Sequence, residues 1–584
     1  MILKALYDYY QRCEDIAPMN MAYVDYYYAI VIDEKGNFID LEPLGGDDGQ
    51  PLLVFRPEER TSAPIAHCMG DNGSYVLGIK ELKDPSRVEV EFKKNRKNHE
   101  CFLNDITTIH DALPDNKYSK AVWAFYQTYD SVVRSNITTN SQWNSLSKVL
   151  GKHITFRIKG DLKLAACDEE IIRWKVSQID NDNSERACLV TGKIAKPVDG
   201  TYSTFIIGGK SNARLVAFQE HSGYDSYGFT KCLNASISEE AEFKYTTALL
   251  KLLAKNSHNK FSIGNRTYLF WASSNDDAAL HAEEGLFDLL GFSDSANEDD
   301  PNANIMKVRE VFKSIFSGRM KTTLDDKFYI LGLAPNSARI AVVYWSETKL
   351  RDFAGMILKH FEDMNVGDSK HPYYGLKDML GAVTLSKKHT DATPNLPDTV
   401  VKSIFQGLPY PQTLFGAAIR RIRAEQDVTF YGGPCRIAIL KAYLNRINKN
   451  QIKLQPMLDK DNTNQGYLCG RLFAVLDKMQ EEANGTNGVR ERYMNSASAT
   501  PSAVFATLLN LSVHHAEKLG TGRKINFEKL KQEIMDKLSS DGFPAHLDLQ
   551  DQGRFFVGYY HQRQNFFTGK GNGDTVEKEE DNKQ

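Results

Sequence analysis

The sequence predicts a multidomain α+β protein, with mixed α/β N-terminal and central portions followed by a C-terminal four-helix bundle. Its 584 residues are too many for a single hydrophobic core. β-branched and aromatic runs alternate with amphipathic stretches over the first 455 residues, and apolar residues recur only at helical spacing after them. We therefore divide the chain into an N-terminal portion (1–235), a central portion (236–455), a helical bundle (456–572) and a polar, disordered tail (573–584).

The N-terminal portion opens with a helix and continues with strands. Apolar residues spaced three or four apart predict a helix over 1–13. The aromatic run 22–32 and the segment 38–41 flank a turn, so they predict a hairpin. Further short strands are expected at 52–55 and 75–79, with a glycine-containing turn at 70–74 before the last of them.

Later elements are predicted from caps and periodicity. Helices are expected at 118–134 and at 239–255, the second behind an N-cap at Ser238. Strands are expected at 154–158 and 203–207. A second hairpin pairs 328–333 with 339–345 and is followed by a helix near 348–363.

The bundle portion contains four amphipathic patterns. The first carries Leu468, Leu472 and Met479 on one stripe, and the second starts at the N-cap and proline pair Thr500 and Pro501. The third helix is expected to begin behind Asn526, and the fourth spans roughly 549–565. Short, glycine-bearing connections between such helices are typical of a bundle.

Several function classes find no support in the sequence. The eight cysteines form no C-x-x-C pair, so neither a zinc site nor a disulfide framework is indicated. No phosphate-binding loop or hydrolase motif is present, and we expect no catalytic residue, no cofactor and no metal. An alternative is a nuclease centred on His110 and Asp111, but a working metal site needs further ligands. The N-terminus lacks a signal peptide, and no membrane span is present, so we expect a cytoplasmic protein.

Charge is segregated along the chain. The net charge of −3 argues against a protein that coats nucleic acid. Residues 402–453 nevertheless hold nine basic residues against two acidic ones, and 276–300 hold nine acidic residues and no lysine or arginine. The distribution favours local basic patches that bind a phosphate backbone, although solvated helix faces would give the same pattern.

The turn at 70–74 is a candidate for reading DNA. It consists of Gly70, Asp71, Asn72, Gly73 and Ser74. Its glycines permit close backbone approach, and the Asn72 amide offers a donor and an acceptor to base edges in a minor groove. The competing interpretation is a plain hairpin turn with positive φ at Asn72 and Gly73.

Two basic segments are candidates for contacting the DNA backbone. The first contains Lys93, Lys94, Arg96 and Lys97, which could equally form a solubilising loop. The second contains Arg420, Arg421 and Arg423, followed by Arg436, Lys441 and Arg446. Helical spacing allows only part of this second set to share one face.

Aromatic residues near position 227 are candidates for stacking on unpaired bases. Tyr224, Tyr227 and Phe229 lie in the seven-residue stretch from Gly223 to Phe229. Aromatic planes bind single strands without sequence preference. The alternative is that these side chains pack in a core.

Seven segments, in order along the chain, resemble the large-subunit family of the type I-C CRISPR surveillance complex, Cascade. They are MILKALYDYYQR at the start and residues 71–78, 226–228, 329–339, 470–476, 492–501 and 552–562. The resemblance implies a non-catalytic subunit that recognises the protospacer-adjacent motif (PAM) in double-stranded DNA, aids duplex opening and holds the displaced strand. Base pairing with the guide RNA then supplies sequence identity.

The same resemblance implies partners. They are the crRNA-bearing backbone and end-capping subunits, a helicase-nuclease that docks on the chain, and small subunits resembling its own C-terminal bundle. Met457 is the internal start that we propose for such small subunits. The rival hypotheses are a CRISPR-associated nuclease and a purely structural scaffold that never contacts DNA.

Overall fold

The computed structural model describes twelve ranges of the chain: residues 1–60, 63–82, 87–179, 185–218, 225, 227–290, 303–323, 325–367, 373–429, 432–448, 453–486 and 488–568. The predicted tail, 573–584, lies outside them. Contacts divide the chain into two compact units. Unit 1 contains Met1–Ala254 with Pro335–Ile340, and unit 2 contains Lys255–Ala334 with Ala341–Gln584. Both units are built from sheets and helices, so the predicted α+β class is confirmed.

A five-stranded sheet is the framework of unit 1. Its strands are β1 (Met21–Ile32), β2 (Phe38–Pro43), β3 (Gln50–Phe55), β4 (Gly70–Asn72) and β5 (His153–Ile158). The long strand β1 pairs antiparallel with β3 through its first half and with β2 through its second half. β5 runs parallel to β1, and β4 pairs antiparallel with β5. The sheet order is therefore β2-β1-β5-β4, with β3 also on β1.

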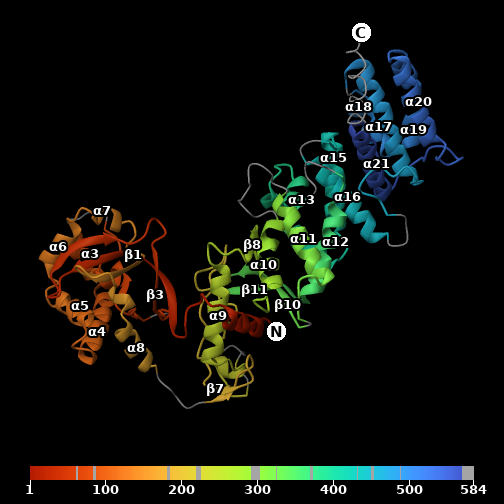
Figure 1. Cartoon of the computed structure of the whole chain (residues 1–584). Helices are drawn as coiled ribbons and strands as arrows, with labels where there is room; N and C mark the ends of the chain where they lie inside the picture. Colours follow the sequence, from red (N-terminus) through yellow and green to blue (C-terminus); the bar gives the residue numbers. More distant parts are fainter. Residues whose placement is uncertain are drawn as a thin grey trace, which may run out of the picture. The chain divides into compact units, whose positions relative to one another are not determined.

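Helices cover one face of this sheet, as Figure 1 shows. They are α2 (Gly73–Val76), α3 (Val88–Lys94), α4 (Arg96–Ala112), α5 (Lys117–Gln127), α6 (Ser131–Thr138), α7 (Trp143–Leu146) and α8 (Glu169–Ser177). Alternate β1 residues Tyr28, Ile30 and Ile32 share a buried core with Phe102 of α4 and Phe125 of α5. Ala29 of β1 faces a second, smaller core on the other side of the sheet, as the period of two requires.

The rest of unit 1 contains α1 (Ile2–Arg12), α9 (Glu239–Leu253) and the short pair β6 (Arg186–Ala187) and β7 (Ile194–Ala195). α1 packs along α9, and the Tyr7 hydroxyl donates to Glu240 at 3.0 Å. The Ser238 side chain caps α9 by accepting from Ala241 N, as predicted.

Unit 2 contains most of a four-stranded sheet in the order β11-β10-β9-β8; the β10–β11 turn, Pro335–Ile340, belongs to unit 1. Its strands are β8 (Lys260–Ile263), β9 (Arg266–Ala272), β10 (Lys327–Asn336) and β11 (Arg339–Lys349). The helices that follow or separate them are α10 (Asp277–Leu289), α11 (Ala303–Ser317), α12 (Leu350–Met364), α13 (Leu376–Ala382), α14 (Leu396–Gln406), α15 (Gln412–Glu425) and α16 (Gly433–Ile447).

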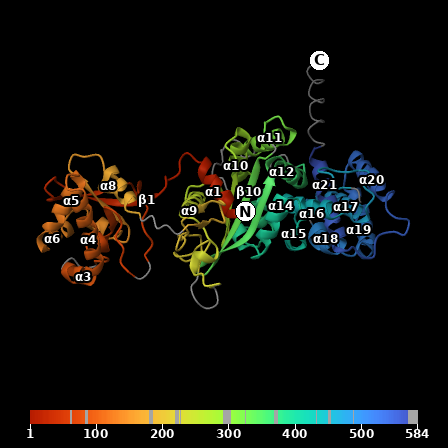
Figure 2. The same cartoon turned by 90° about the horizontal axis from the view of Figure 1, so that it is seen from below.

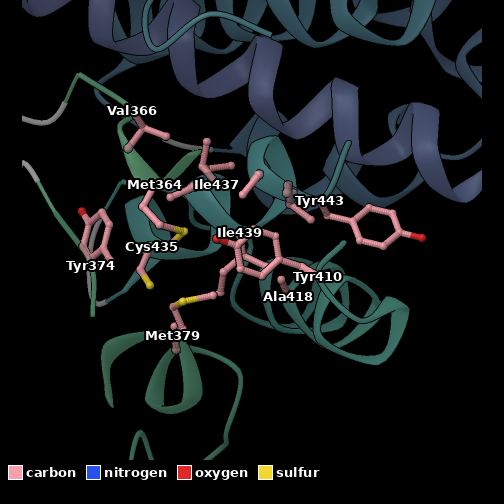
Figure 3. Close-up of a cluster of buried hydrophobic side chains, with 14 of the residues drawn as sticks. Met364, Val366, Tyr374, Met379, Tyr410, Ala418, Cys435, Ile437, Ile439 and Tyr443 are labelled. Atoms are coloured by element: carbon pink, nitrogen blue, oxygen red, sulfur yellow. The ribbon is translucent and has the colours of Figure 1, made fainter. Parts of the chain in front are cut away.

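The C-terminal bundle contains α17 (Gln465–Asn484), α18 (Gly488–Ala497), α19 (Pro501–Glu517), α20 (Thr521–Met535) and α21 (Leu549–Thr568). The helices gather around α17, which packs along α21 (Figure 2). One hydrophobic core runs from the sheet of unit 2 through α16 into α21. Figure 3 shows part of it, where Met364, Met379, Ala418 and Ile439 converge from four helices. The central and bundle portions therefore share their buried interior.

Most predicted elements are confirmed, including both hairpins and the helices at 1–13, 239–255 and 348–363. The four bundle helices are present with a shorter fifth, α18, but α20 begins at Thr521 instead of after Asn526. No strand forms at 203–207, where Thr204 N instead bonds to Ala213 O.

Two further predictions were wrong because side chains cap the backbone. The helix expected at 118–134 is split into α5 and α6, since Asp130 accepts from Val132 N and Val133 N and starts a new helix. The strand expected at 75–79 is absent, because α2 and the turn after it occupy these residues. The strand lies earlier, in Gly70–Asn72.

Candidate nucleic-acid interface

The predicted DNA-reading turn is a corner at which strand β4 passes directly into helix α2. Asn72 ends the strand opposite His153 of β5. Its φ of −72° and ψ of 165° are extended, and its Oδ1 accepts from Ser74 N at 3.0 Å and Ser74 Oγ at 2.7 Å. Asn72 therefore acts as the N-cap of α2, and the hairpin turn with positive φ was a wrong interpretation.

The glycines of the corner serve internal packing. A Cβ on Gly70 would lie 2.7 Å from Tyr26 Cε1, and one on Gly73 would lie 2.7 Å from Ile79 O and from Leu150 Cδ2. Both positions thus point into the protein and do not open a path toward a ligand. Of the five predicted residues, only Asn72 is half-buried, whereas the other four are buried.

The buried carboxylate of Asp71 bonds to both the corner and the segment that precedes it. Its carboxylate is 0% exposed, and Oδ1 accepts from Asn72 N at 2.7 Å. Oδ2 accepts from His67 N at 3.0 Å and pairs with Arg60, whose guanidinium also stacks over the ring of Tyr75. Burial raises the pKa of Asp71, and the Arg60 charge opposes that shift. Asp71 therefore holds the preceding segment against the corner.

Two histidines that the sequence analysis missed lie beside Asp71. His67 Nδ1 is 3.3 Å from His153 Nε2 and 3.8 Å from Asp71 Oδ1. Burial lowers the pKa of each histidine to about 4, so both imidazoles are neutral at neutral pH. His67 and Asp71 are four residues apart, and this spacing is the one local sequence feature that could have indicated that they lie together. His153 lies 86 residues from His67, and no sequence pattern connects the two.

The first basic segment lies next to this corner. It forms the end of α3 and the start of α4, and Lys93, Lys94, Arg96 and Lys97 are all exposed. Asn98, in the first turn of α4, donates from Nδ2 to Ser74 Oγ at 3.3 Å. The next residue, His99, places Nδ1 2.7 Å from Tyr75 O. Two segments that the sequence predicted separately are thus brought together.

The four basic side chains of this segment differ in their local partners. Lys94 forms an ion pair with Glu91 at 2.6 Å, and Arg96 forms one with Glu100 at 2.6 Å. Lys93 and Lys97 form no ion pair with any residue that the structure describes. The positive charge least compensated by the chain is therefore that of Lys93 and Lys97.

The second basic segment, in unit 2, is only partly at the surface. Arg420 of α15 is exposed. Arg421 pairs with Glu425 one turn later, and half-buried Arg423 donates from Nη2 to Ser498 Oγ at 3.5 Å. Burial lowers the pKa of Arg423. The three arginines therefore do not form one surface.

The continuation of that segment is buried. Arg436 is 0% exposed and donates to both oxygens of Glu425, at 2.5 and 3.1 Å. Lys441 Nζ donates to Glu362 O at 3.1 Å, and Arg446 Nε donates to Asp363 Oδ2 at 2.6 Å. The expectation that these residues face a nucleic-acid strand was wrong, because they hold α16 inside unit 2.

The alternative catalytic pair does not gather further ligands. His110 Nδ1 lies 3.5 Å from exposed Asp111, and the His110 ring stacks on Trp123 with 4.3 Å between centroids. Within the described ranges, no further histidine, cysteine or carboxylate joins the pair as a potential metal ligand. The stacking accounts for His110 as a packing residue.

The aromatic candidates are placed differently from one another. Tyr227 is 97% exposed, in a turn with φ of 54°. The Phe229 ring lies 4.3 Å from the guanidinium of Arg186. Tyr224 lies outside the described residues. Tyr227 is therefore an open aromatic plane, and Phe229 has a partner within the protein.

Comparison with known protein families identifies a match over nearly the whole chain. Residues 6–567 match the family described as CRISPR-associated protein (Cas_Csd1). No curated protein matches the chain. Among the helices that the structure describes, none is long and apolar enough to cross a bilayer. Because the family match covers nearly the whole chain, this protein belongs to the Cas_Csd1 family of CRISPR-associated proteins.

Proposed function

We propose that the chain is the non-catalytic large subunit of a crRNA-guided type I-C Cascade. In this role it recognises the PAM in target double-stranded DNA, aids duplex opening and stabilises the displaced strand. Membership of a CRISPR-associated family supports the proposal. The assignment to the type I-C large subunit rests on the seven segments that resemble that family in the same order along the chain.

The observation that carries the proposal is the junction between the β4–α2 corner and the start of α4. The Asn98–Ser74 hydrogen bond ties the start of α4, which carries exposed Lys97, to the corner that contains Asn72. Lysines bind phosphates without regard to sequence, whereas an amide can hydrogen-bond a base edge. We infer that the two segments together combine a backbone grip with a base-reading group.

The reading group is the Asn72 amide nitrogen. Oδ1 is occupied by Ser74, and Nδ2 forms no hydrogen bond with any described residue. An amide N–H₂ donates, so it would select the N3 and O2 acceptors of a minor groove. The helix cap holds the amide in place before DNA binds, which lowers the entropic cost of recognition.

Duplex opening requires little energy from this subunit. Each base-pair step costs about 1.4 kcal/mol to melt and is later compensated by pairing with the guide. Phosphate contacts from Lys93 and Lys97 supply the first few kcal/mol. Exposed Tyr227 is the side chain that we assign to stacking on the displaced single strand.

We propose that the other components work in the cytoplasm with this chain. The crRNA-bearing backbone and end-capping subunits supply sequence identity, and a helicase-nuclease that docks on the chain performs cleavage.

Small subunits resembling the C-terminal bundle follow from the same proposal, with Met457 as their start. Met457 lies before α17 and is exposed. In the full chain α21 packs against α15 and α16, so a product starting at Met457 would expose that apolar face. We therefore expect a neighbouring subunit to cover it. Expression of the intact gene without a short C-terminal product would contradict this part of the proposal.

The test of PAM reading is Asn72→Ser in the assembled complex. Serine caps a helix as well as asparagine does, so α2 stays intact while the amide donor is lost. We expect five- to about 150-fold weaker binding of PAM duplexes, as for the loss of one base contact. Binding of duplexes without a PAM should be unchanged.

Two other outcomes would reject the proposal. Unchanged binding of both duplexes by Asn72→Ser and by a Lys93→Ala/Lys97→Ala double variant would indicate a scaffold that does not contact DNA. Metal-dependent cleavage by the isolated chain, lost in Asp111→Asn, would indicate a nuclease.

A further inference from the structure

We propose that His67, Asp71 and His153 bind one zinc ion directly beneath the β4–α2 corner. The three residues come from different parts of unit 1: the segment before β4, strand β4 itself, and β5. Their potential ligand atoms all lie within 4.8 Å of one another, and this is the one such group among the residues that the structure describes. The proposal is independent of PAM reading.

The spacing of the two imidazoles favours zinc. Two nitrogens bound at 2.0–2.1 Å with a tetrahedral angle lie about 3.3–3.4 Å apart. His67 Nδ1 and His153 Nε2 are separated by 3.3 Å. At the same bond length, the right angle of an octahedral site would bring them to about 2.9 Å. The pair is thus set for a tetrahedral ion.

Asp71 supplies the third ligand through Oδ1. This oxygen accepts one hydrogen bond, from Asn72 N, whereas Oδ2 is used by His67 N and Arg60. Oδ1 lies 3.8 Å from His67 Nδ1 and within 4.8 Å of the ligand atom of His153, so the carboxylate has to move toward both imidazoles to reach tetrahedral spacing. The Arg60 charge weakens attraction for a dication, so we expect moderate affinity.

The surroundings of the histidines also suit a ligand role. His67 Nε2 lies 3.3 Å from Glu58 O, and donation to that carbonyl leaves the Nδ1 lone pair directed at His153. His67 also lines a cavity of about 380 Å³, together with Arg56, Glu58 and Lys175.

Zinc at this position would join three segments that meet at the corner. It would tie β4 to β5 through side chains in addition to the backbone ladder. Binding to the folded state alone stabilises that state. The ion would therefore order the platform that carries Asn72.

The competing explanation is a buried, hydrogen-bonded imidazole pair without metal. Titration of the purified full chain with Zn²⁺ by calorimetry, after chelator treatment and dialysis, separates the two. We expect one equivalent per chain with a dissociation constant below about 10 μM. His67→Gln and His153→Gln should each weaken binding at least tenfold, as removal of one ligand does. His514→Gln, at an exposed position in unit 2, is the control and should bind like the wild type.

Co²⁺ provides a second readout that needs no variant. A tetrahedral site with nitrogen and oxygen ligands gives intense visible absorption, whereas six-coordinate Co²⁺ absorbs weakly. Appearance of the tetrahedral spectrum, and its displacement by Zn²⁺, would support the site even if the histidine variants fold poorly. Absence of both the Zn²⁺ heat and the tetrahedral spectrum, or equal binding by the histidine variants, would overturn it. Neither metal-binding measurement involves DNA, so its outcome does not depend on whether the chain reads a PAM.

Discussion

The two basic regions of the chain illustrate opposite uses of positive charge. At the α3–α4 junction of unit 1, four cations lie exposed, and Asn98 in the next turn of the chain bonds to Ser74 of the β4–α2 corner. In α15 and α16 of unit 2, most cations are turned inward, and Arg436, Lys441 and Arg446 are buried. Both regions look equally basic in the sequence. A count of cations in the sequence therefore identifies a nucleic-acid-binding surface only when the partners of those cations in the fold are known.

The residue types agree with these roles. Arginine presents several donors in a planar fork, so Arg436 can satisfy Glu425 and Ala382 O together inside the protein. Lysine carries a strongly hydrated point charge, so it costs more to bury and favours solvent or phosphate. Lys441 shows this cost, because burial lowers its pKa to about 8.

The strongest test of the comparison is Glu425→Ala. It leaves the buried Arg436 guanidinium without its carboxylate, so we expect the free energy of unfolding of unit 2 to fall by about 3–5 kcal/mol. Urea unfolding followed by circular dichroism measures this loss. A decrease below 1 kcal/mol would show that the α15–α16 arginines are not structural.

Two buried histidines predict that the stability of unit 2 depends on pH. Burial, aided by nearby Arg446, lowers the pKa of His360 to about 3, and burial with Lys441 does the same for His561. In the unfolded chain these groups titrate near pH 6.5, so acidification protonates the unfolded state first and stability is lost as the pH falls below 6.5.

The expected loss is about 2 kcal/mol per histidine between pH 7 and pH 5. Urea unfolding at the two pH values tests it. His360→Gln should reduce the pH dependence, whereas His514→Gln, at an exposed position, should leave it unchanged. Equal pH dependence in the wild type and His360→Gln would argue against the buried neutral imidazole.

At the α3–α4 junction we expect an effect on DNA and not on folding. Lys93→Ala with Lys97→Ala should lower the slope of log K against log salt by about two units, equally for PAM and non-PAM duplexes. The matched control is Lys94→Ala with Arg96→Ala, whose cations already pair with Glu91 and Glu100. A larger slope change in the control would reverse the assignment of the phosphate contacts.

The smallest effect is expected for Arg420→Ala. The Arg420 side chain is exposed, whereas its neighbours Arg421 and Arg423 have partners within the protein. The free energy of unfolding should therefore change by less than about 0.5 kcal/mol. A small drop in DNA affinity without a drop in stability would place Arg420 with the lysines of unit 1 in function.

Local patterns predicted much of the fold. The β1–β2 hairpin followed from an aromatic run and a turn, and the α9 N-cap from Ser238. The corner at Gly70–Ser74 was identified as a candidate site, but its conformation was not. Asn72 and Gly73 are typical of a hairpin turn, and only pairing of β4 with β5 makes Asn72 a helix cap.

By itself, the sequence determined where most helices and strands form, which family the chain resembles, and which runs carry charge. Only the tertiary structure decided which charges are exposed and which polar groups meet. Periodicity reports the local face of an element, whereas the burial of a polar group depends on partners from distant segments. The pairs Arg60–Asp71 and His67–His153 illustrate this dependence. In each pair, the local sequence around one residue does not indicate which residue will be its partner.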